Sequence, residues 1–374
     1  MKILFVYKYL TMGGVETVLR ARLDALSARG FLPSVWFLSD GPGRAIFQDC
    51  KARVFIGSQR KLAACLKREQ FDLCLTLDTP EVFQLSGLNH LHYRWIVEFH
   101  TPYPAAQQYL RELYSDQVQA VLTPSFFQAH QARALLTEDI PVCVCPNPLR
   151  ENFLTGPVKA AGDQKPILGW VGRMDSLKNW KGFIKLAALL LEHRKDVTFW
   201  LIGDSPDRSM EKEFERFARE LGVYERICWF RGVDHRHIPR FLDRIRSSGG
   251  VVLSTSLGES FGMTIAEAMA RCCAVVVPDQ SPFCEFVHQG ETGFFYNVEN
   301  LSTAVPPLLR LLENHRLRET MGALGRLAIL KSHHPDRAMS VLVKKLEEIS
   351  RAAESCVGLQ GGEAELLVQA HYGQ

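Results

Sequence analysis

Short apolar runs alternate with segments of helical period along most of the chain. After the run KILFVY, apolar residues recur three or four positions apart between Val15 and Arg29, which predicts an amphipathic helix. Six more apolar runs follow within the first 150 residues: SVWFL, ARVFIG, DLCLTL, RWIVEF, AVLTPS and VCVCP. These runs are apolar at nearly every position, which predicts strands buried on both faces, as in a parallel sheet.

The alternation stops at Pro146–Pro166, a stretch rich in proline, glycine and polar residues that is typical of a linker. It then resumes through six further runs: ILGWVG, VTFWLIG, ICWFRG, VVLSTS, AVVVPD and GFFYN. The pattern predicts an α/β protein of two Rossmann-like, doubly wound domains. We place the first domain at 1–150, a linker at 151–166 and the second domain at 167–335. A helix at 336–353 is expected to pack back on the first domain, and 354–374 is a weakly patterned tail.

Composition removes several classes of protein. A net charge of +3 over 374 residues is too small to indicate nucleic-acid binding. The ten cysteines form no CxxC pair, so zinc-ligand spacing is absent, and buried thiols in a reducing compartment are expected. No apolar run approaches the ~20 residues of a membrane helix, and the N-terminal run fits a strand better than a signal peptide. The predicted location is the cytoplasm.

In open α/β sheets, ligands bind beyond the carboxyl ends of the strands, so the loops that follow strands are the candidates for chemistry. The loop KYLTMGGVET contains Gly13 and Gly14, which permit close backbone approach at the start of a helix. A tight strand-to-helix turn explains these glycines equally well. His100, in VEFHTPYP, ends a strand and is expected to point toward a ligand, although a lone histidine there is more often structural.

The loop VGRMDSLKNWKGF holds three cations just after a strand: Arg173, Lys178 and Lys181. Cations at the mouth of a parallel sheet suit a phosphate or diphosphate, because Arg can bind such a group with two hydrogen bonds. The alternative is a solvated basic turn. Of the two lysines, Lys178 is preferred as the phosphate ligand and Lys181 is assigned to the following helix.

The loop GESFGMTIAEAMA places Glu259 and Glu267 eight residues apart. Paired carboxylates could hydrolyse a glycoside, but that needs a separation of ~5–9.5 Å, and eight helical residues rise ~12 Å. Glu267 could instead belong to a capping box with Thr264. The preferred interpretation is a long polar ligand, gripped by Glu259 at one end and Glu267 at the other, with phosphate between them.

Two pairs of neighbouring histidines, His235/His237 and His333/His334, have no carboxylate or cysteine constellation around them in the sequence. We interpret both pairs as surface features.

Four motifs together resemble the family-4 retaining glycosyltransferases. GESFGMTIAEAMA is similar to their E-x7-E motif, VGRMDSLKN to GR-x4-K, FRGVD to F-x-G, and GGVE to their glycine loop. PFCEFVHQGETGFFY resembles the stretch behind their active site. Two departures are RCCAVV, where a glycine turn is usual, and SPFC, where a glycine pair is common. The resemblance implies the GT-B architecture, in which two Rossmann-like domains face each other across a cleft.

The resemblance also implies roles for single residues. Glu267 would bind ribose hydroxyls, Arg173 and Lys178 would neutralise the donor diphosphate, and His100 would face the sugar. Further donor contacts would come from backbone or side-chain groups of Gly13, Gly14, Val233, Glu259, Ser260, Phe261, Gly262 and Met263.

The implied activity is transfer of a hexosyl group from a nucleotide-diphosphate sugar to an acceptor hydroxyl, with UDP favoured over GDP. The acceptor would be a glycan, a lipid-linked glycan or a small molecule. The chain contains no DxD, so no metal or other cofactor is expected. The alternatives are another GT-B enzyme such as an epimerase or phosphorylase, a dinucleotide oxidoreductase, and a non-catalytic nucleotide-sugar-binding protein.

Basic residues in the first domain raise the question of peripheral contact with an anionic membrane. They lie in the helix Val15–Arg29, at Arg20, Arg22 and Arg29, and in the stretch with Arg60, Lys61, Lys67 and Arg68. A solvated helix face is the preferred interpretation.

Overall fold

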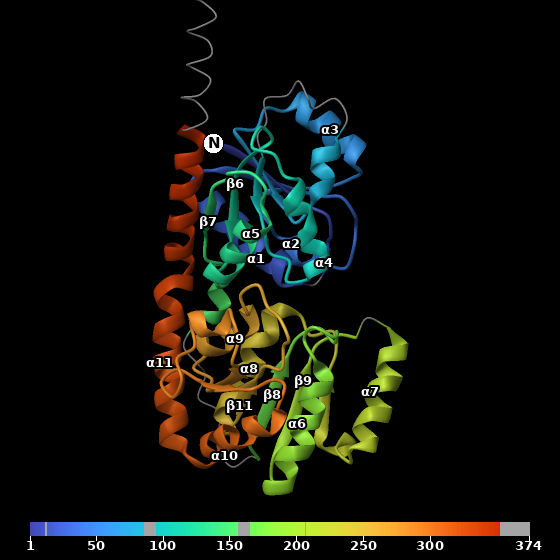
Figure 1. The fold of residues 1–374 in the computed structure, drawn as a ribbon, viewed down its shortest axis with the longest axis vertical. Helices are drawn as coiled ribbons and strands as arrows, with labels where there is room; N and C mark the ends of the chain where they lie inside the picture. Colours follow the sequence, from blue (N-terminus) through green and yellow to red (C-terminus); the bar gives the residue numbers. More distant parts are fainter. Residues whose placement is uncertain (12, 86–94, 156–164, 206, 352–374) are drawn as a thin grey trace, which may run out of the picture. The chain divides into compact units, whose positions relative to one another are not determined.

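The computed structural model describes residues 1–11, 13–85, 95–155, 165–205 and 207–351. These residues form two compact units (Figure 1). Unit 1 comprises Met1–Pro124, Gln128–Pro148 and the described residues from Pro335 onward, and unit 2 comprises Ser125–Phe127 and Leu149–His334. Each unit contains one sheet in which every strand pair is parallel, so the predicted α/β, doubly wound class is confirmed.

The sheet of unit 1 has the order β3-β2-β1-β4-β5-β6-β7. Its strands are β1 (Lys2–Tyr7), β2 (Leu32–Phe37), β3 (Arg53–Ile56), β4 (Leu73–Leu77), β5 (Trp95–Glu98), β6 (Val118–Thr123) and β7 (Val142–Val144). The helices are α1 (Gly14–Ala28), α2 (Arg44–Phe47), α3 (Gln59–Arg68), α4 (Pro104–Gln107) and α5 (Phe126–Leu135), with 3-10 turns η1 (Pro80–Gln84) and η2 (Gln108–Glu112). All seven strands coincide with the runs named from the sequence.

Both faces of this sheet are covered, as near-continuous apolar strands require. On one face, Leu19, Leu23 and Leu26 of α1 pack on strand residues such as Phe5. On the other face, Leu62 of α3 packs with residues of β1, β2 and β4. The helical run 335–351 adds Met339, Leu342 and Leu346 to the first face, and so belongs to unit 1 (Figure 1). Residues 352–374, which include the predicted tail, lie outside the described residues.

The sheet of unit 2 has the order β10-β9-β8-β11-β12-β13. Its strands are β8 (Ile167–Val171), β9 (Thr198–Ile202), β10 (Ile227–Phe230), β11 (Val251–Leu253), β12 (Val275–Pro278) and β13 (Phe294–Tyr296). The helices are α6 (Trp180–His193), α7 (Arg208–Glu220), α8 (Ile238–Ser247), α9 (Met263–Ala270), α10 (Val305–Glu313) and α11 (His315–His333). Short 3-10 turns are η3 (Glu151–Phe153), η4 (Tyr224–Arg226), η5 (His235–His237), η6 (Phe283–Glu285) and η7 (Leu301–Ala304).

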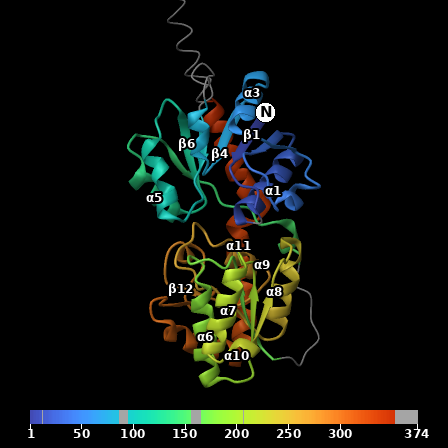
Figure 2. The same cartoon turned by 90° about the vertical axis from the view of Figure 1, so that its right-hand side faces the viewer.

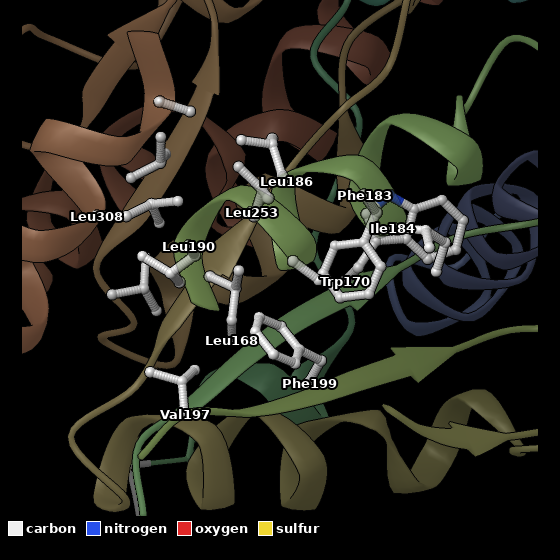
Figure 3. Close-up of a cluster of buried hydrophobic side chains, with 14 of the residues drawn as sticks. Leu168, Trp170, Phe183, Ile184, Leu186, Leu190, Val197, Phe199, Leu253 and Leu308 are labelled. Atoms are coloured by element: carbon white, nitrogen blue, oxygen red, sulfur yellow. The ribbon is translucent and has the colours of Figure 1, made fainter. Parts of the chain in front are cut away.

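Two apolar clusters sandwich this second sheet. Helices α6, α7 and α10 pack on one face (Figure 2), α8 and α9 pack on the other, and α11 contributes Met321 to the first cluster and Ile329 to the second. Figure 3 shows the first cluster, in which Phe183 and Leu190 of α6 meet Leu168 and Phe199 of the strands. The alternation of side chains along each strand sends Leu168 to one cluster and its neighbour Ile167 to the other.

The predicted linker at 151–166 begins inside unit 2. Leu149 and Phe153 are completely buried there, and the guanidinium of Arg271 donates to the carbonyl oxygen of Thr155. Arg326 donates in the same way to the carbonyl of Leu154. The chain therefore joins unit 2 at Leu149, and residues 156–164 lie outside the described residues.

The solvated basic face expected on the first helix is wrong for Arg20 and Arg22, whereas Arg29 is exposed, as expected. Arg20 is buried and pairs with Asp24 and Asp49, at 2.7 Å in each case. Arg22 is 1% exposed and pairs with Glu98 of β5. Carboxylates from other elements draw both side chains inward, so neither is available to a membrane surface. The cations of α3, namely Arg60, Lys61, Lys67 and Arg68, are exposed.

Within the described residues, no helix combines the length and apolar character needed to cross a bilayer.

Candidate functional site

Four of the predicted residues of unit 2 lie in loops that follow parallel strands. Arg173 and Lys178 follow β8, Val233 follows β10, and Glu259 follows β11. The carboxyl ends of parallel strands meet at one edge of a sheet, so these loops share that edge.

A buried hydroxyl fixes the loop that carries Lys178. Thr255, just after β11, lies 3.1 Å from the carbonyl oxygen of Lys178 and 2.9 Å from that of Asn179. The same hydroxyl accepts a hydrogen bond of 2.9 Å from the indole N–H of Trp170 in β8. The amide of Lys178 also donates to Asp175 at 2.8 Å. The Lys178 backbone is therefore anchored to the residues that follow β8 and β11.

The structure brings Lys178 and Glu259 together. The ammonium Nζ of Lys178 lies 2.5 Å from Oε1 of Glu259, and the hydroxyl of Ser256 donates to the same oxygen at 2.8 Å. The two side chains are 18% and 8% exposed, so water weakens the pair less than it would at the surface. One of the three ammonium N–H donors is used in this bond, and Oε2 of Glu259 has no hydrogen-bond partner among the described residues. Both groups retain capacity for a ligand.

Lys181 lies elsewhere. It is on the first turn of α6, and its ammonium pairs with Glu213 of α7 on an exposed surface. Arg173 stands 57% exposed at the sheet edge, with one guanidinium nitrogen 3.3 Å from Asp175. The register that places Lys178 rather than Lys181 beside Glu259 follows from Asn179, which caps α6 by accepting from the amide of Gly182 at 3.1 Å.

The loop after Glu259 turns sharply into α9 at Gly262. Its φ of 101° is a left-handed conformation that favours glycine, and a Cβ there would come within 2.7 Å of the Phe283 ring. Phe261 is buried against Phe286, so only its backbone can reach a ligand. The amides of Met263 and Thr264 make no hydrogen bond to a described residue, as expected at a helix N-terminus. Such amides, with the helix dipole, attract anions.

Glu267 does not belong to a capping box. The residue that caps α9 is Gly262, and Thr264 lies inside the helix, so the geometry of that motif is absent. Glu267 is 5% exposed, and its Oε1 lies 2.9 Å from Nε2 of His235. Its second oxygen has no partner among the described residues, which leaves it available to hydroxyl groups.

His235 was wrongly interpreted as a surface residue. Its ring packs on Phe153 with centroids 5.2 Å apart, Nδ1 lies 3.5 Å from the Arg150 guanidinium, and Nε2 contacts Glu267. The signal that could have found it is its place just beyond β10. His333 is also buried, with its ring centroid 4.3 Å from that of Phe261, whereas His237 is exposed and His334 is half-buried.

Two further predicted features of unit 2 are turns. Val233 follows Gly232, which has a φ of 64°, and its side chain packs on the apolar cluster of α8 and α9. In RCCAVV, Cys272 itself adopts a left-handed φ of 59°, where a glycine would be unstrained. The described part of the chain contains no group of three or more His, Cys, Asp or Glu side chains arranged to hold a metal ion.

In unit 1, His100 lies just after β5 and is 5% exposed. Its Nε2 lies 2.9 Å from Oε2 of Glu98, which also pairs with Arg22. The amide of His100 donates to Asp78 at 3.0 Å. Loss of hydration around Asp78 raises the pKa of its carboxyl to about 6. Sequence reasoning missed Glu98, which ends β5 two residues before His100.

Gly13 precedes α1 in the same unit. A Cβ on Gly13 would lie 2.6 Å from a carboxylate oxygen of Glu16, whereas a Cβ on Gly14 would meet nothing within 4 Å. Glu16 is 1% exposed and accepts from the amide and hydroxyl of Thr11, at 2.6 and 2.5 Å. This loop therefore combines open space at Gly14 with a buried negative charge beside Gly13.

Comparison with known proteins gives a consistent result. Residues 157–327 match the family model of glycosyl transferases group 1. Alpha-D-kanosaminyltransferase of Streptomyces kanamyceticus is 28% identical over 42% of this chain, and the match spans 39% of that protein. Phosphatidyl-myo-inositol mannosyltransferase of Mycobacterium tuberculosis is 24% identical over 86% of this chain and 90% of its own length. The Anabaena protein HepE, solved with UDP and glucose, superposes with a TM-score of 0.78 at 18% identity, covering 93% of this chain and all of HepE.

The fold and the matched segment define the class that this chain resembles: its fold is GT-B, and residues 157–327 are similar to glycosyl transferases group 1. The matched segment lies within the second unit.

Proposed function

We propose that this chain is a retaining glycosyltransferase of family-4 type, which moves a hexosyl group from a nucleotide-diphosphate sugar to an acceptor hydroxyl. UDP is the favoured nucleotide, and HepE, similar in fold, is a protein solved with UDP. The observation that carries the proposal is the Lys178–Glu259 pair, held at the sheet edge where amides of α9 lack partners. Cation, carboxylate and free amides together suit a ligand with a diphosphate between two polyhydroxylated groups.

In this proposal the diphosphate lies against Lys178, Arg173 and the first amides of α9. Negative charge grows on the leaving diphosphate as the anomeric C–O bond breaks, and an ammonium, a guanidinium and a helix N-terminus all stabilise it. Glu259 keeps Lys178 in place through Oε1 and offers Oε2 to a hydroxyl of the donor sugar. The backbone from Ser260 to Met263 lies along the same ligand and contacts it.

Glu267 binds the ribose hydroxyls with the oxygen that His235 leaves open. The backbone at Val233, which follows the turn at Gly232, contacts the base. From unit 1, His100 contacts a sugar hydroxyl. The Gly13–Gly14 loop is better suited to sugar hydroxyls than to phosphate, because the buried carboxylate of Glu16 would repel an anion.

Retention of configuration needs no protein base if the leaving phosphate takes the proton of the acceptor hydroxyl on the same face. The acceptor is a glycan, a lipid-linked glycan or a small molecule.

We place the protein in the cytoplasm, where nucleotide sugars and reduced thiols coexist. All nine cysteines of the described residues are free thiols, which suits a reducing compartment.

The test is to incubate the protein with a panel of UDP- and GDP-sugars and measure nucleotide release with and without acceptor extracts. Release that depends on one donor and is stimulated by one extract is the expected result, and NMR of the product should show the donor's anomeric configuration. An inverted product would refute the retaining mechanism. Release of an isomerised nucleotide sugar, or of a sugar phosphate, would identify an epimerase or a phosphorylase instead.

Replacing Glu267 with alanine is expected to weaken UDP binding by about 10–100-fold, since hydrogen bonds to a charged group contribute ~1.5–3 kcal/mol. Calorimetry with UDP measures the Kd, and thermal unfolding measures stability. Glu213→Ala, which removes an exposed carboxylate paired with Lys181, is the matched control and should leave the Kd unchanged. An unaltered Kd with a lower Tm for Glu267→Ala would mean that the carboxylate only supports His235.

Transfer is expected to proceed at the same rate after treatment with EDTA, because cationic side chains and helix amides are proposed to do the work of a metal. The measurement is the initial rate with EDTA, and with added Mg²⁺ or Mn²⁺. Loss of turnover in EDTA that either metal restores would contradict this part of the proposal.

A further inference from the structure

We propose that Glu98 is the positioning residue for His100, and that with Arg22 it holds the imidazole in the tautomer protonated on Nε2. Nδ1 is then left as a hydrogen-bond acceptor. Only one part of this inference rests on the proposed function, namely that the group hydrogen-bonded to Nδ1 is a hydroxyl of the donor sugar. It assigns a function to a buried ion pair, Arg22–Glu98, that lies outside the four motifs of the family resemblance.

The carboxylate of Glu98 decides the tautomer because it is an acceptor only. Glu98 ends β5 and is completely buried, and its Oε2 lies 2.9 Å from Nε2 of His100. An ionised carboxylate cannot donate, so the proton between the two atoms must belong to Nε2. The ring is neutral when Nδ1 is unprotonated, and Nδ1 has no hydrogen-bond partner among the described residues.

Arg22 keeps the carboxylate ionised. Burial alone would raise the pKa of Glu98, but the charge of Arg22 and the contact with His100 lower it below its ordinary value. Arg22 comes from α1 and is held in turn by the side-chain oxygen of Asn147, at 3.3 Å. An unpaired carboxyl at this depth would become protonated and could then donate to His100, which would reverse the tautomer.

The backbone of His100 is fixed independently of its ring. Its amide donates to the carboxylate of Asp78, which also accepts from the hydroxyl of Tyr109 at 3.1 Å. The ring can therefore change direction only by side-chain rotation, and its contact with Glu98 prevents this. Three other titratable groups lie near the pair: burial raises the pKa of the Asp78 carboxyl to about 6, that of the Tyr109 hydroxyl well above its ordinary value, and that of the Cys145 thiol to about 12. Glu98 is the one anion within hydrogen-bond distance of the ring among the described residues.

A ring held in this way accepts a hydrogen bond rather than donating a proton. The proposal therefore assigns His100 to orientation of the sugar and excludes it as the acid that protonates the leaving group. Loss of Glu98 should lower kcat, because the sugar is less well oriented, while UDP affinity stays as it is.

The experiment is long-range ¹H–¹⁵N NMR of the full chain labelled in its histidine rings, with His100 identified by the signal lost in His100→Gln. The native protein is expected to show a ring protonated on Nε2 and unprotonated on Nδ1. In Glu98→Gln the amide can donate or accept, so the tautomers should mix or invert. A native ring protonated on Nδ1, or on both nitrogens, would overturn the proposal, as would an unchanged spectrum in Glu98→Gln.

Glu98→Gln leaves Arg22 buried without a counter-ion, so the double variant Arg22→Gln/Glu98→Gln, with no buried charge, is made in parallel. Asp243→Asn is the matched control: it also removes a carboxylate from a buried arginine, Arg271, but should leave the His100 signals unchanged. In an active preparation Glu98→Gln should lower kcat about 10–100-fold, as is typical for groups that orient a functional histidine, with UDP Kd unchanged. The NMR result needs no donor, so the expected spectra without any transferase activity would refute the proposed function alone.

Discussion

Replacing Lys178 with alanine is expected to lower kcat by about 10²–10³-fold, or ~3–4 kcal/mol, with the fold retained. In the proposed reaction the charge on the leaving diphosphate is greater in the transition state than in the bound donor. A cation that contacts it therefore accelerates the chemical step rather than only tightening binding. The side chain is not needed in a core, because it is held at the sheet edge by Glu259. The measurement is kcat at saturating donor, with Tm as a check on folding.

Three related variants make this result specific. Arg173→Ala should lose activity to a similar degree, since its exposed guanidinium is proposed to contact the same diphosphate. Lys181→Ala should stay near the native kcat, because its ammonium pairs with Glu213 on the surface. Lys178→Ala also leaves Glu259 without its cation. Lys178→Arg keeps the positive charge but changes the geometry of the side chain, so comparing the two variants separates the effect of charge from that of geometry. If Lys181→Ala were the inactive variant, our assignment of the phosphate lysine would be wrong by three residues, and if all were active, the diphosphate would bind elsewhere.

Replacing Asp243 with alanine is expected to reduce the free energy of unfolding of unit 2 by about 3–5 kcal/mol, the usual cost of leaving one member of a buried ion pair alone. Asp243 accepts two hydrogen bonds from Arg271, at 2.8 and 2.5 Å, and Arg271 is 2% exposed. Arg271 directly follows α9 and also bonds to Thr155, so the pair holds the first residues of unit 2 against that helix. Urea unfolding followed by tryptophan fluorescence measures the loss.

The double variant Asp243→Leu/Arg271→Met should recover most of that stability, because an apolar pair of similar size needs no counter-charge. Glu319→Ala is the control for a less buried pair: Glu319 and Arg246 are 40% and 22% exposed, and its loss should cost less than about 1 kcal/mol. A stable Asp243→Ala variant would show that water reaches Arg271 and that the pair contributes little.

Patterns local in the chain predicted the elements of the fold. All the apolar runs taken as strands are strands of the two sheets, because each run had to bury both of its faces and could do so only between layers of helices. Ligands of open α/β sheets bind beyond the carboxyl ends of the strands, and this rule selected the loops of Lys178 and Glu259. It needs no tertiary information, because chain direction alone decides which end of a parallel strand faces the ligand. Strong local signals of this kind do not depend on what lies far away in the sequence.

The residues that the sequence analysis misjudged all have partners distant in the chain. His235 contacts Glu267, 32 residues later, and Arg22 pairs with Glu98, 76 residues later. An arginine on a helix or a histidine in a turn has the same local pattern whether it is solvated or paired. Hydropathy assigns such residues to the surface because an unpaired charge is costly to bury, and only the folded chain supplies the partner that removes the cost.

By itself, therefore, the sequence determined the α/β class, the succession of strands and helices, and the loops that carry the candidate chemistry. These depend on periodicity and chain direction, both of which are properties of short segments. The tertiary structure alone decided that Lys178 pairs with Glu259, that Gly262 and not Thr264 caps α9, and that Glu98 contacts His100. Each of these depends on the direction of a side chain in a packed interior, which is set by neighbours that the chain brings together only when it folds.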